Sequence, residues 1–309
     1  MIALLLGTLT LDNRIDRIDI RGTFLQPIML GRIDLPAGLL MLVLLLAIIA
    51  LTCRELCAIY RAKGLEVSQL MITLASMIGC VLFYILPHKL DSQTTIAIYG
   101  SALALLFVGA LFRHSFFQQR TAGAIAAGST VAFTMIYAGI LPGFYLGIRR
   151  WHTAWVVLGI ILIAKSCDIG AYFTGRALGR HKLIPWLSPG KTWEGLVGGV
   201  IFSGLVAVAL TWLGNRWGFT GQYTRDPQTR ELILQARHIP LWLAALGGVL
   251  LGLVGQVGDL TASLFKRDAG IKDSGASIPG FGGILDVVDS PILVAPVAFW
   301  LLRWATYLN

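Results

Sequence analysis

Ionisable side chains interrupt one of the most apolar stretches of this 309-residue sequence. Asp259, Ser263 and Lys266 follow the apolar run 250–258, and on a helix they fall within about 60° of one another. One helix face therefore presents a carboxylate, a hydroxyl and an ammonium group, with Arg267 adjacent. Because a charge inside an apolar helix is costly, these residues indicate a functional site rather than ordinary solvent-exposed charges.

A second helix is expected to open at Ile284, directly after a glycine-rich segment. Asp286 and Asp289 are spaced i, i+3 on its first turns. Simple capping of a helix N-terminus is one interpretation of this pair. With Asp259 added, three carboxylates near one depth would repel one another unless a cation lay between them. Hard oxygen ligands indicate Mg²⁺ rather than zinc.

An earlier apolar helix repeats the pattern. Lys165, Asp168, Tyr172 and Arg176 fall within about 80° of one another around a helix. The loop 176–194 that follows is basic and contains glycine, serine and threonine.

This loop contains Ser188, Lys191 and Thr192, which suit phosphate oxygens through charge and hydrogen bonds. A positively charged loop at the membrane surface is the alternative interpretation. The spacing of a P-loop is absent. Together, a phosphate-binding loop and a Mg²⁺ site favour phosphoryl or nucleotidyl transfer.

Composition identifies the setting of these groups. The chain is 56% hydrophobic and 13% charged, with a mean hydropathy of +0.75. Soluble domains carry about 25% charged residues, so an ordinary soluble enzyme and a disordered protein are both excluded. We expect an all-α, polytopic integral membrane helical bundle. The net charge of +9 fits either anionic headgroups or a substrate with several phosphates.

Apolar runs long enough to span a bilayer number about eight. They are expected near 35–59, 67–86, 94–112, 122–141, 154–174, 195–214, 240–265 and 291–307. Many glycines lie inside the later runs, which predicts close helix packing in the second half. We divide the chain into a charged interfacial arm (1–34) that faces solvent, N-terminal membrane helices (35–153) and catalytic helices with their loops (154–309).

Other features set expectations of a simpler kind. The four cysteines are interpreted as small apolar helix residues, and the first eleven residues do not have the pattern of a cleavable signal peptide. Basic residues are balanced between the two sides, so they do not orient the chain. The polar loops 176–194 and 266–289 are separated by two spans, and we therefore expect them on the same side.

Two segments resemble a known signature. Residues 263–275 (SLFKRDAGIKDSG) and 279–289 (PGFGGILDVVD) are similar to the motif of the phosphatidate cytidylyltransferase (CDP-diacylglycerol synthase) family. Residues 168–172 (DIGAY) and 188–195 (SPGKTWEG) also resemble that family. The chain departs from the pattern at Phe281, where the family usually has histidine, and at Val287, where it usually has arginine.

The resemblance implies that CTP and phosphatidic acid react to give CDP-diacylglycerol and pyrophosphate. It places Asp259, Asp286 and Asp289 at a Mg²⁺ centre, with K⁺ as an optional second ion. Phosphates would be held, or the loop shaped, by a second group of residues: Ser263, Lys266, Arg267, Lys272 and Asp273. The facing, nucleotide-binding wall would comprise Asp168, Tyr172, Ser188, Lys191 and Thr192. The catalytic set is Asp259, Lys266, Arg267, Asp286 and Asp289.

The implied partners are CTP, phosphatidic acid and membrane lipids, with no nucleic acid and with room for a homodimer. Because CTP is cytosolic, both polar loops are expected on the cytoplasmic face of the cell (inner) membrane. Two alternatives stay open. A CTP-dependent lipid-alcohol kinase would direct attack at the γ-phosphorus, and a non-enzymatic anion transporter would use the same charges as a pathway.

Overall fold

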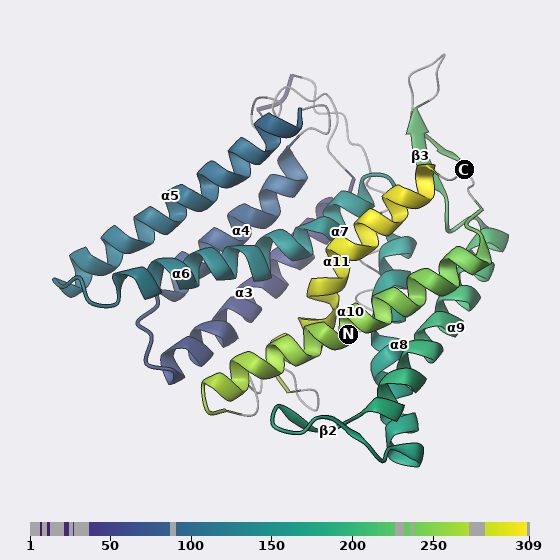
Figure 1. Cartoon of the computed structure of the whole chain (residues 1–309). Coiled ribbons are helices and arrows are strands. Elements are labelled where there is room, and N and C mark those ends of the chain that lie inside the picture. Colours follow the sequence, from purple (N-terminus) through teal and green to yellow (C-terminus); the bar gives the residue numbers. More distant parts are fainter. Residues whose placement is uncertain are drawn as a thin grey trace. The chain divides into compact units, whose positions relative to one another are not determined.

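A computed structural model of the chain is almost entirely helical (Figure 1). It describes residues 37–86, 91–225, 232–235, 238–271 and 282–307, together with isolated positions nearer the N-terminus: Gly7, Leu11, Asp12, Gly22, Thr23, Phe24 and Pro27. The all-α membrane bundle expected from composition is confirmed.

The helices follow the apolar runs of the sequence. In chain order they are α3 (Leu39–Ala62), α4 (Gln69–Ile85), α5 (Ser92–Gln118), α6 (Ala124–Thr134), the π-helical η1 (Met135–Ile140), α7 (Leu141–Arg149), α8 (Ala154–Leu178), α9 (Trp193–Trp217), α10 (Leu241–Asp268) and α11 (Ile284–Tyr307).

Within the described residues, seven helical segments are long and apolar enough to cross a membrane, with α6, η1 and α7 forming one of them. The 17-residue α4 is an eighth, shorter apolar helix. All eight lie at the ranges expected from the sequence, so the prediction of about eight spans is confirmed.

The chain packs as two compact units, each described by itself below. The first, which we call the α3–α6 unit, contains residues 14–146 and 265–287. The second, the α8–α10 unit, contains residues 1–13, 147–264 and 288–309. The division of the sequence into arm, N-terminal helices and catalytic helices stays a prediction.

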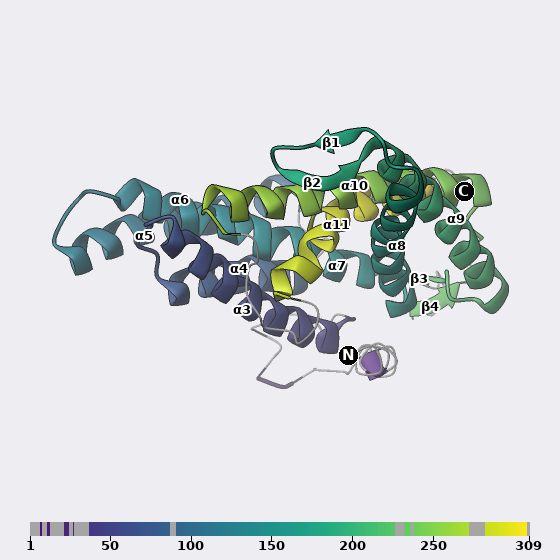
Figure 2. The ribbon, with the colours of Figure 1, turned by 90° about the horizontal axis from the view of Figure 1, so that it is seen from below.

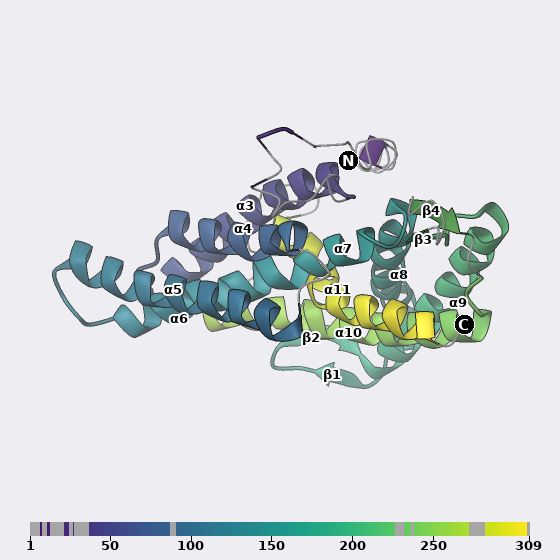
Figure 3. The same cartoon turned by 90° about the horizontal axis from the view of Figure 1, so that it is seen from above.

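In the α3–α6 unit, α4 packs against both α3 and η1, and α5 packs against α6 (Figure 3). Polar groups between these helices hydrogen-bond to one another, because no water is present in the bilayer core to satisfy them. The Ser76 hydroxyl donates to the Thr134 carbonyl over 3.0 Å, and the hydroxyls of Tyr60 and Thr134 lie 2.9 Å apart. These bonds join α3, α4 and the end of α6.

In the α8–α10 unit, glycines bring helix backbones into direct contact, as expected from the sequence. A methyl group placed on Gly170 of α8 would lie 3.0 Å from the Cα of Gly199 on α9. One placed on Gly258 of α10 would lie 2.5 Å from the carbonyl oxygen of Asp289 on α11. The predicted close packing of the second half is confirmed, and it sets α10 directly against the start of α11 in this unit.

Two small antiparallel hairpins connect the helices of this unit. The strands β1 (Lys182–Ile184) and β2 (Ser188–Thr192) join α8 to α9 (Figure 2). The strands β3 (Gln222–Arg225) and β4 (Leu232–Gln235) join α9 to α10. The sequence predicted a loop at 176–194, and the structure shows that part of it is a hairpin.

One residue of the N-terminal arm is buried. The Asp12 carboxylate accepts a hydrogen bond from Arg149 Nε over 2.8 Å, and both side chains are at most 1% exposed. The expectation of a solvated arm is therefore wrong at Asp12. The physical reason is that a buried guanidinium requires a counter-ion, and alternating charges in the arm gave no sign of that demand.

Replacing Gly258 with alanine tests the close contact of α10 and α11. The added methyl group meets backbone that cannot rotate away, so we expect the Gly258→Ala protein to lose about 1–3 kcal/mol of stability. The measurement is thermal unfolding of the purified protein in detergent.

Gly159→Ala on α8 is the matched control, because no atom lies within 4 Å of its added methyl group. We expect that variant to be neutral or slightly stabilised, by up to about 1 kcal/mol. Equal unfolding temperatures for the two variants would contradict the close contact.

Candidate functional site

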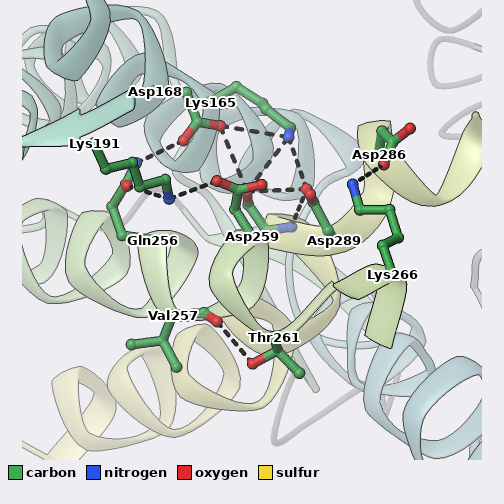
Figure 4. Close-up of polar contacts among 11 residues, drawn as sticks. Lys165, Asp168, Lys191, Gln256, Val257, Asp259, Thr261, Lys266, Asp286 and Asp289 are labelled. Atoms are coloured by element: carbon green, nitrogen blue, oxygen red, sulfur yellow. Dashed lines mark hydrogen bonds and ion pairs between the residues drawn. The ribbon is translucent and has the colours of Figure 1, made fainter. Parts of the chain in front are cut away.

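Five charged side chains of the α8–α10 unit converge to form what we call the charge cluster (Figure 4). Its members are Lys165 and Asp168 from α8, Lys191 from β2, Asp259 from α10 and Asp289 from α11. The cluster thus contains three carboxylates and two ammonium groups. They come from three helices that are far apart in the sequence and from one hairpin.

Lys165 joins α8 to α11. Its Nζ lies 3.5 Å from Asp168 Oδ2 and 3.3 Å from Asp289 Oδ1. The Asp289 side chain is only 3% exposed. Its Oδ1 also accepts a hydrogen bond from the backbone N–H of Ser290 over 2.6 Å. The Ser290 hydroxyl donates to the same oxygen over 3.2 Å, so one ammonium group, one backbone N–H and one hydroxyl hold the most buried carboxylate of the cluster.

Lys191 joins the hairpin to α10. Its Nζ lies 2.5 Å from Asp259 Oδ2 and donates to Gln256 Oε1 over 2.8 Å. The amide of Gln256 in turn donates to Asp168 Oδ1 over 2.7 Å. Gln256 therefore fixes the positions of a cation and an anion at once, and the hairpin lies beside the C-terminal half of α10.

The carboxyl groups of Asp259 and Asp289 are within hydrogen-bonding reach of each other (Figure 4). Two ionised carboxylates at that separation repel, so the pair requires either a shared proton or a cation. Counted as ionised, the cluster has one more negative than positive charge. Binding of a further cation here stays a prediction.

The other predicted carboxylate, Asp286, is described in the α3–α6 unit, where it pairs with Lys266. Asp286 Oδ1 lies 2.6 Å from Lys266 Nζ, and Oδ2 accepts from the Gly283 N–H over 3.2 Å. The side chains are 22% and 12% exposed. The predicted opening of a helix at Ile284 is confirmed.

A buried glutamate anchors that helix. Glu55 of α3 accepts the backbone N–H groups of Ile284 and Leu285 over 2.8 and 2.9 Å. These donors have no partner within the helix itself, and a carboxylate is favoured at this end by the helix dipole. Glu55 therefore fixes where α11 starts, and hence where Asp286 lies within the α3–α6 unit.

Sequence reasoning assigned no role to Glu55, Lys165, Gln256 or Ser290. A signal was present for Glu55, since it is a charge inside the apolar run of α3, the same criterion that selected Asp259. Lys165 lay on the selected face of α8 but was not assigned to the site. Nothing in the sequence distinguished Gln256 or Ser290.

The remaining predicted residues fall into three groups. Tyr172 and Arg267 are exposed, and the Tyr172 hydroxyl accepts from Arg176 over 3.0 Å. Thr192 is buried and caps α9 by accepting the Gly195 N–H over 3.1 Å, whereas Ser188 opens β2 and Ser263 is half-buried on α10. Lys272 and Asp273 lie outside the described residues, as does Phe281, whereas Val287 is half-buried on α11.

The carboxylates suit a hard metal ion by their chemistry. Asp168, Asp259 and Asp289 offer only oxygen donors, the ligands that Mg²⁺ prefers. In the part of the chain that the structure describes, no group of three or more His, Cys, Asp or Glu side chains is arranged to hold a metal ion. Lysine ammonium groups contact these carboxylates instead. The predicted metal centre stays a prediction.

Comparisons with known proteins agree on one family. The model of the cytidylyltransferase family matches residues 20–305. The chain is 33% identical over 271 residues to the phosphatidate cytidylyltransferase of Staphylococcus saprophyticus, covering 87% of this chain and 92% of that protein. It is 32% identical over 285 residues to the protein of the same name from Synechocystis sp., covering 82% and 85%.

Another relative is the uncharacterized protein YnbB of Escherichia coli, which is 38% identical over 202 residues. That match spans 60% of this chain and 60% of the E. coli protein.

Glu55→Gln tests the anchoring of α11. The amide offers one acceptor without charge and turns a donor toward the backbone N–H groups, so we expect a loss of about 1–3 kcal/mol. Thermal unfolding in detergent measures it.

Glu66→Gln is the control, because Glu66 makes an exposed ion pair with Arg120 and should contribute at most about 1 kcal/mol. If Glu55→Gln unfolds at the temperature of Glu66→Gln, the anchoring role is wrong.

Proposed function

The chain belongs to the cytidylyltransferase family, and from this premise we propose that it transfers the CMP moiety of CTP to phosphatidic acid, giving CDP-diacylglycerol and pyrophosphate. A phosphate oxygen of the lipid attacks the α-phosphorus of CTP. A bond forms between them, the bond from the α-phosphorus to the bridging oxygen breaks, and pyrophosphate leaves. The reaction supplies an activated lipid for phospholipid biosynthesis.

The charge cluster is the observation that supports this proposal. Both reactants are anions, so the main barrier is their mutual repulsion, and fixed cations lower it. Lys165 and Lys191 place two ammonium groups beside carboxylates that hold them in position. The attacking phosphate is already ionised near neutral pH, so the site does not need a strong general base.

The cationic residues have distinct tasks in this scheme. Lys191, on the hairpin, binds phosphate oxygens of the nucleotide, while Gln256 keeps its ammonium group oriented. Lys165 neutralises the buried end of the site next to Asp289. In the other unit, Lys266 is held by Asp286 and provides a further phosphate-binding cation. Arg267, Lys272, Asp273 and Ser263 are proposed to complete the phosphate-binding loop.

Mg²⁺ is the metal that the donor set fits. Asp259 and Asp289 would hold it, since their carboxyl groups already meet and need a cation, and Asp286 is the third proposed ligand. When bound, the ion would neutralise charge that develops on the phosphates. A second ion, K⁺, stays a prediction, as do a homodimer and the absence of a nucleic-acid partner.

The position of the charge cluster allows both a lipid and a water-soluble nucleotide to reach it. The cluster lies at the middle of α8 and in the C-terminal half of α10, beside the polar hairpin that follows the C-terminal end of α8. A lipid can reach such a place from the bilayer and CTP from water. We propose that this end of the helices faces the cytoplasm and that the membrane is the cell (inner) membrane.

The released product separates the proposal from the kinase alternative. Purified protein with CTP, phosphatidic acid and Mg²⁺ should release pyrophosphate and form a lipid-soluble cytidine product. A kinase would release CDP, and a transporter would turn over no CTP at all. The family assignment favours neither alternative.

We expect Asp289→Asn and Asp286→Asn each to lower turnover by at least about 10²-fold, the size of a lost electrostatic contribution to the transition state. Formation of labelled CDP-diacylglycerol measures it, with thermal unfolding as a check on folding. Asp268→Asn is the matched control, because Asp268 makes an exposed pair with Lys63 and should retain activity. Near-normal turnover in both site variants would refute the carboxylate roles.

Removal of divalent cations gives an independent check. We expect a chelator to abolish turnover and added Mg²⁺ to restore it, because carboxylate pairs of this kind require a cation. Unchanged turnover in excess chelator would show that ammonium groups alone suffice and that the metal assignment is wrong.

A further inference from the structure

We propose that a cavity in the α3–α6 unit binds an anionic phospholipid, at a site made of residues other than those of the transfer reaction. The cavity has a volume of about 580 Å³ and lies among the adjacent ends of four helices, α3, α4, α5 and α6. None of its lining residues belongs to the charge cluster. The inference goes beyond the proposed cytidylyl transfer and does not depend on it.

The rim of the cavity is cationic. Arg61, in the last turn of α3, is exposed, and Arg113, near the end of α5, is half-buried. The Arg113 guanidinium lies 4.8 Å from the centre of the Phe117 ring. Among the described residues, neither guanidinium has an ion-pair partner. Two arginines therefore face the cavity, and no ion pair among the described residues neutralises their charge.

The other titratable groups that line the cavity do not cancel this charge. Glu66 is paired with Arg120, over 2.6 Å, and that hydrogen bond lowers the pKa of the Glu66 carboxyl below its usual value. The ring Nε2 of His114 lies 2.9 Å from the Ala122 carbonyl oxygen and is thereby occupied. With Arg120 counted against Glu66, the rim retains two positive charges.

The inner wall is apolar. Ala110, Ala127 and Val131 line it and are at most 8% exposed, and Met71 lies beside them. Val131 is seven residues into the helix that starts at Ala124, which places it about 10 Å inside the helix end. The cavity thus passes from charged groups at the helix ends to hydrocarbon within the membrane-spanning turns.

A cationic rim above an apolar wall matches one kind of ligand. Guanidinium groups bind phosphate oxygens in a bidentate manner, and an apolar wall at membrane depth suits an acyl chain. A soluble phosphate would satisfy the rim and leave the wall without a partner. A zwitterionic lipid would add a positive group beside two arginines. An anionic phospholipid satisfies both parts.

Photo-crosslinking tests the proposal on the full chain. The protein is placed in nanodiscs of phosphatidylcholine that contain a few mole per cent of phosphatidylglycerol with a diazirine in its acyl chain. After illumination, we expect peptides containing Met71 or Val131 to carry the lipid. The same diazirine on phosphatidylcholine should label these peptides about 30-fold less at limiting lipid, since two basic residues at about 1 kcal/mol each favour the anionic lipid.

The charge variants make the test specific. The double variant R61Q/R113Q should reduce labelling by phosphatidylglycerol to the level seen with phosphatidylcholine. The matched control is R54Q/R216Q, which removes the same charge from residues that do not line the cavity and should label as the parent protein does. Persistent labelling of R61Q/R113Q would overturn the proposal.

Competition distinguishes a lipid from a soluble anion. Excess glycerophosphoglycerol, the deacylated headgroup, should leave the labelling intact if the acyl chain contributes to binding. Its complete displacement of the lipid would overturn the proposal in favour of a site for a water-soluble phosphate. Equal labelling by both lipids would overturn the requirement for an anion.

Discussion

Carboxylates and ammonium groups inside an apolar bundle must neutralise one another, and this constraint organises the α8–α10 unit. Asp289 is almost fully buried, and an isolated charge there would be very costly. Lys165 and the Ser290 N–H provide its compensation. The close approach of α10 and α11 at Gly258 brings Asp259 to the same place. Packing by glycine and pairing of charges are therefore two aspects of one arrangement.

Electrostatic balance also connects this arrangement to chemistry. With its carboxylates ionised, the charge cluster has a net charge of −1. Such a charge favours a cation and, with that cation, an anion bound to it. Lys191 comes from a hairpin rather than a membrane helix, so the ion pair with Asp259 joins a loop element to the bundle. The neighbouring Thr192 caps α9 and keeps the hairpin attached to the helix that follows.

Much of the fold was predictable from the sequence because length and apolar character suffice to define membrane helices. Asp168 and Asp259 were selected as charges in apolar helices and Lys191 as a cation in a basic loop, and the structure places all three in the charge cluster. Asp286 and Asp289 were grouped by their i, i+3 spacing and by the resemblance of their segment to the family motif. Spacing cannot show that their main partners differ, Lys266 for one and Lys165 for the other.

What the sequence could not predict depends on partners distant in the chain. The β1–β2 hairpin has a Pro-Gly pair within β2, which favours a loop in sequence terms. The sequence does not distinguish Gln256 from other polar residues, because its partners Lys191 and Asp168 are distant in the chain. Glu55 carried the signal of a buried charge, but its role required knowledge of where α11 begins.

The buried pair of Asp12 and Arg149 bears on how the chain is made. The two residues are 137 positions apart. At ordinary rates of synthesis the Asp12 carboxylate emerges about 7–27 s before its guanidinium exists. During that interval the carboxylate must stay hydrated, so Asp12 can pair with Arg149 only after the ribosome has completed α7. Burial of this early carboxylate therefore waits for a residue that is translated much later.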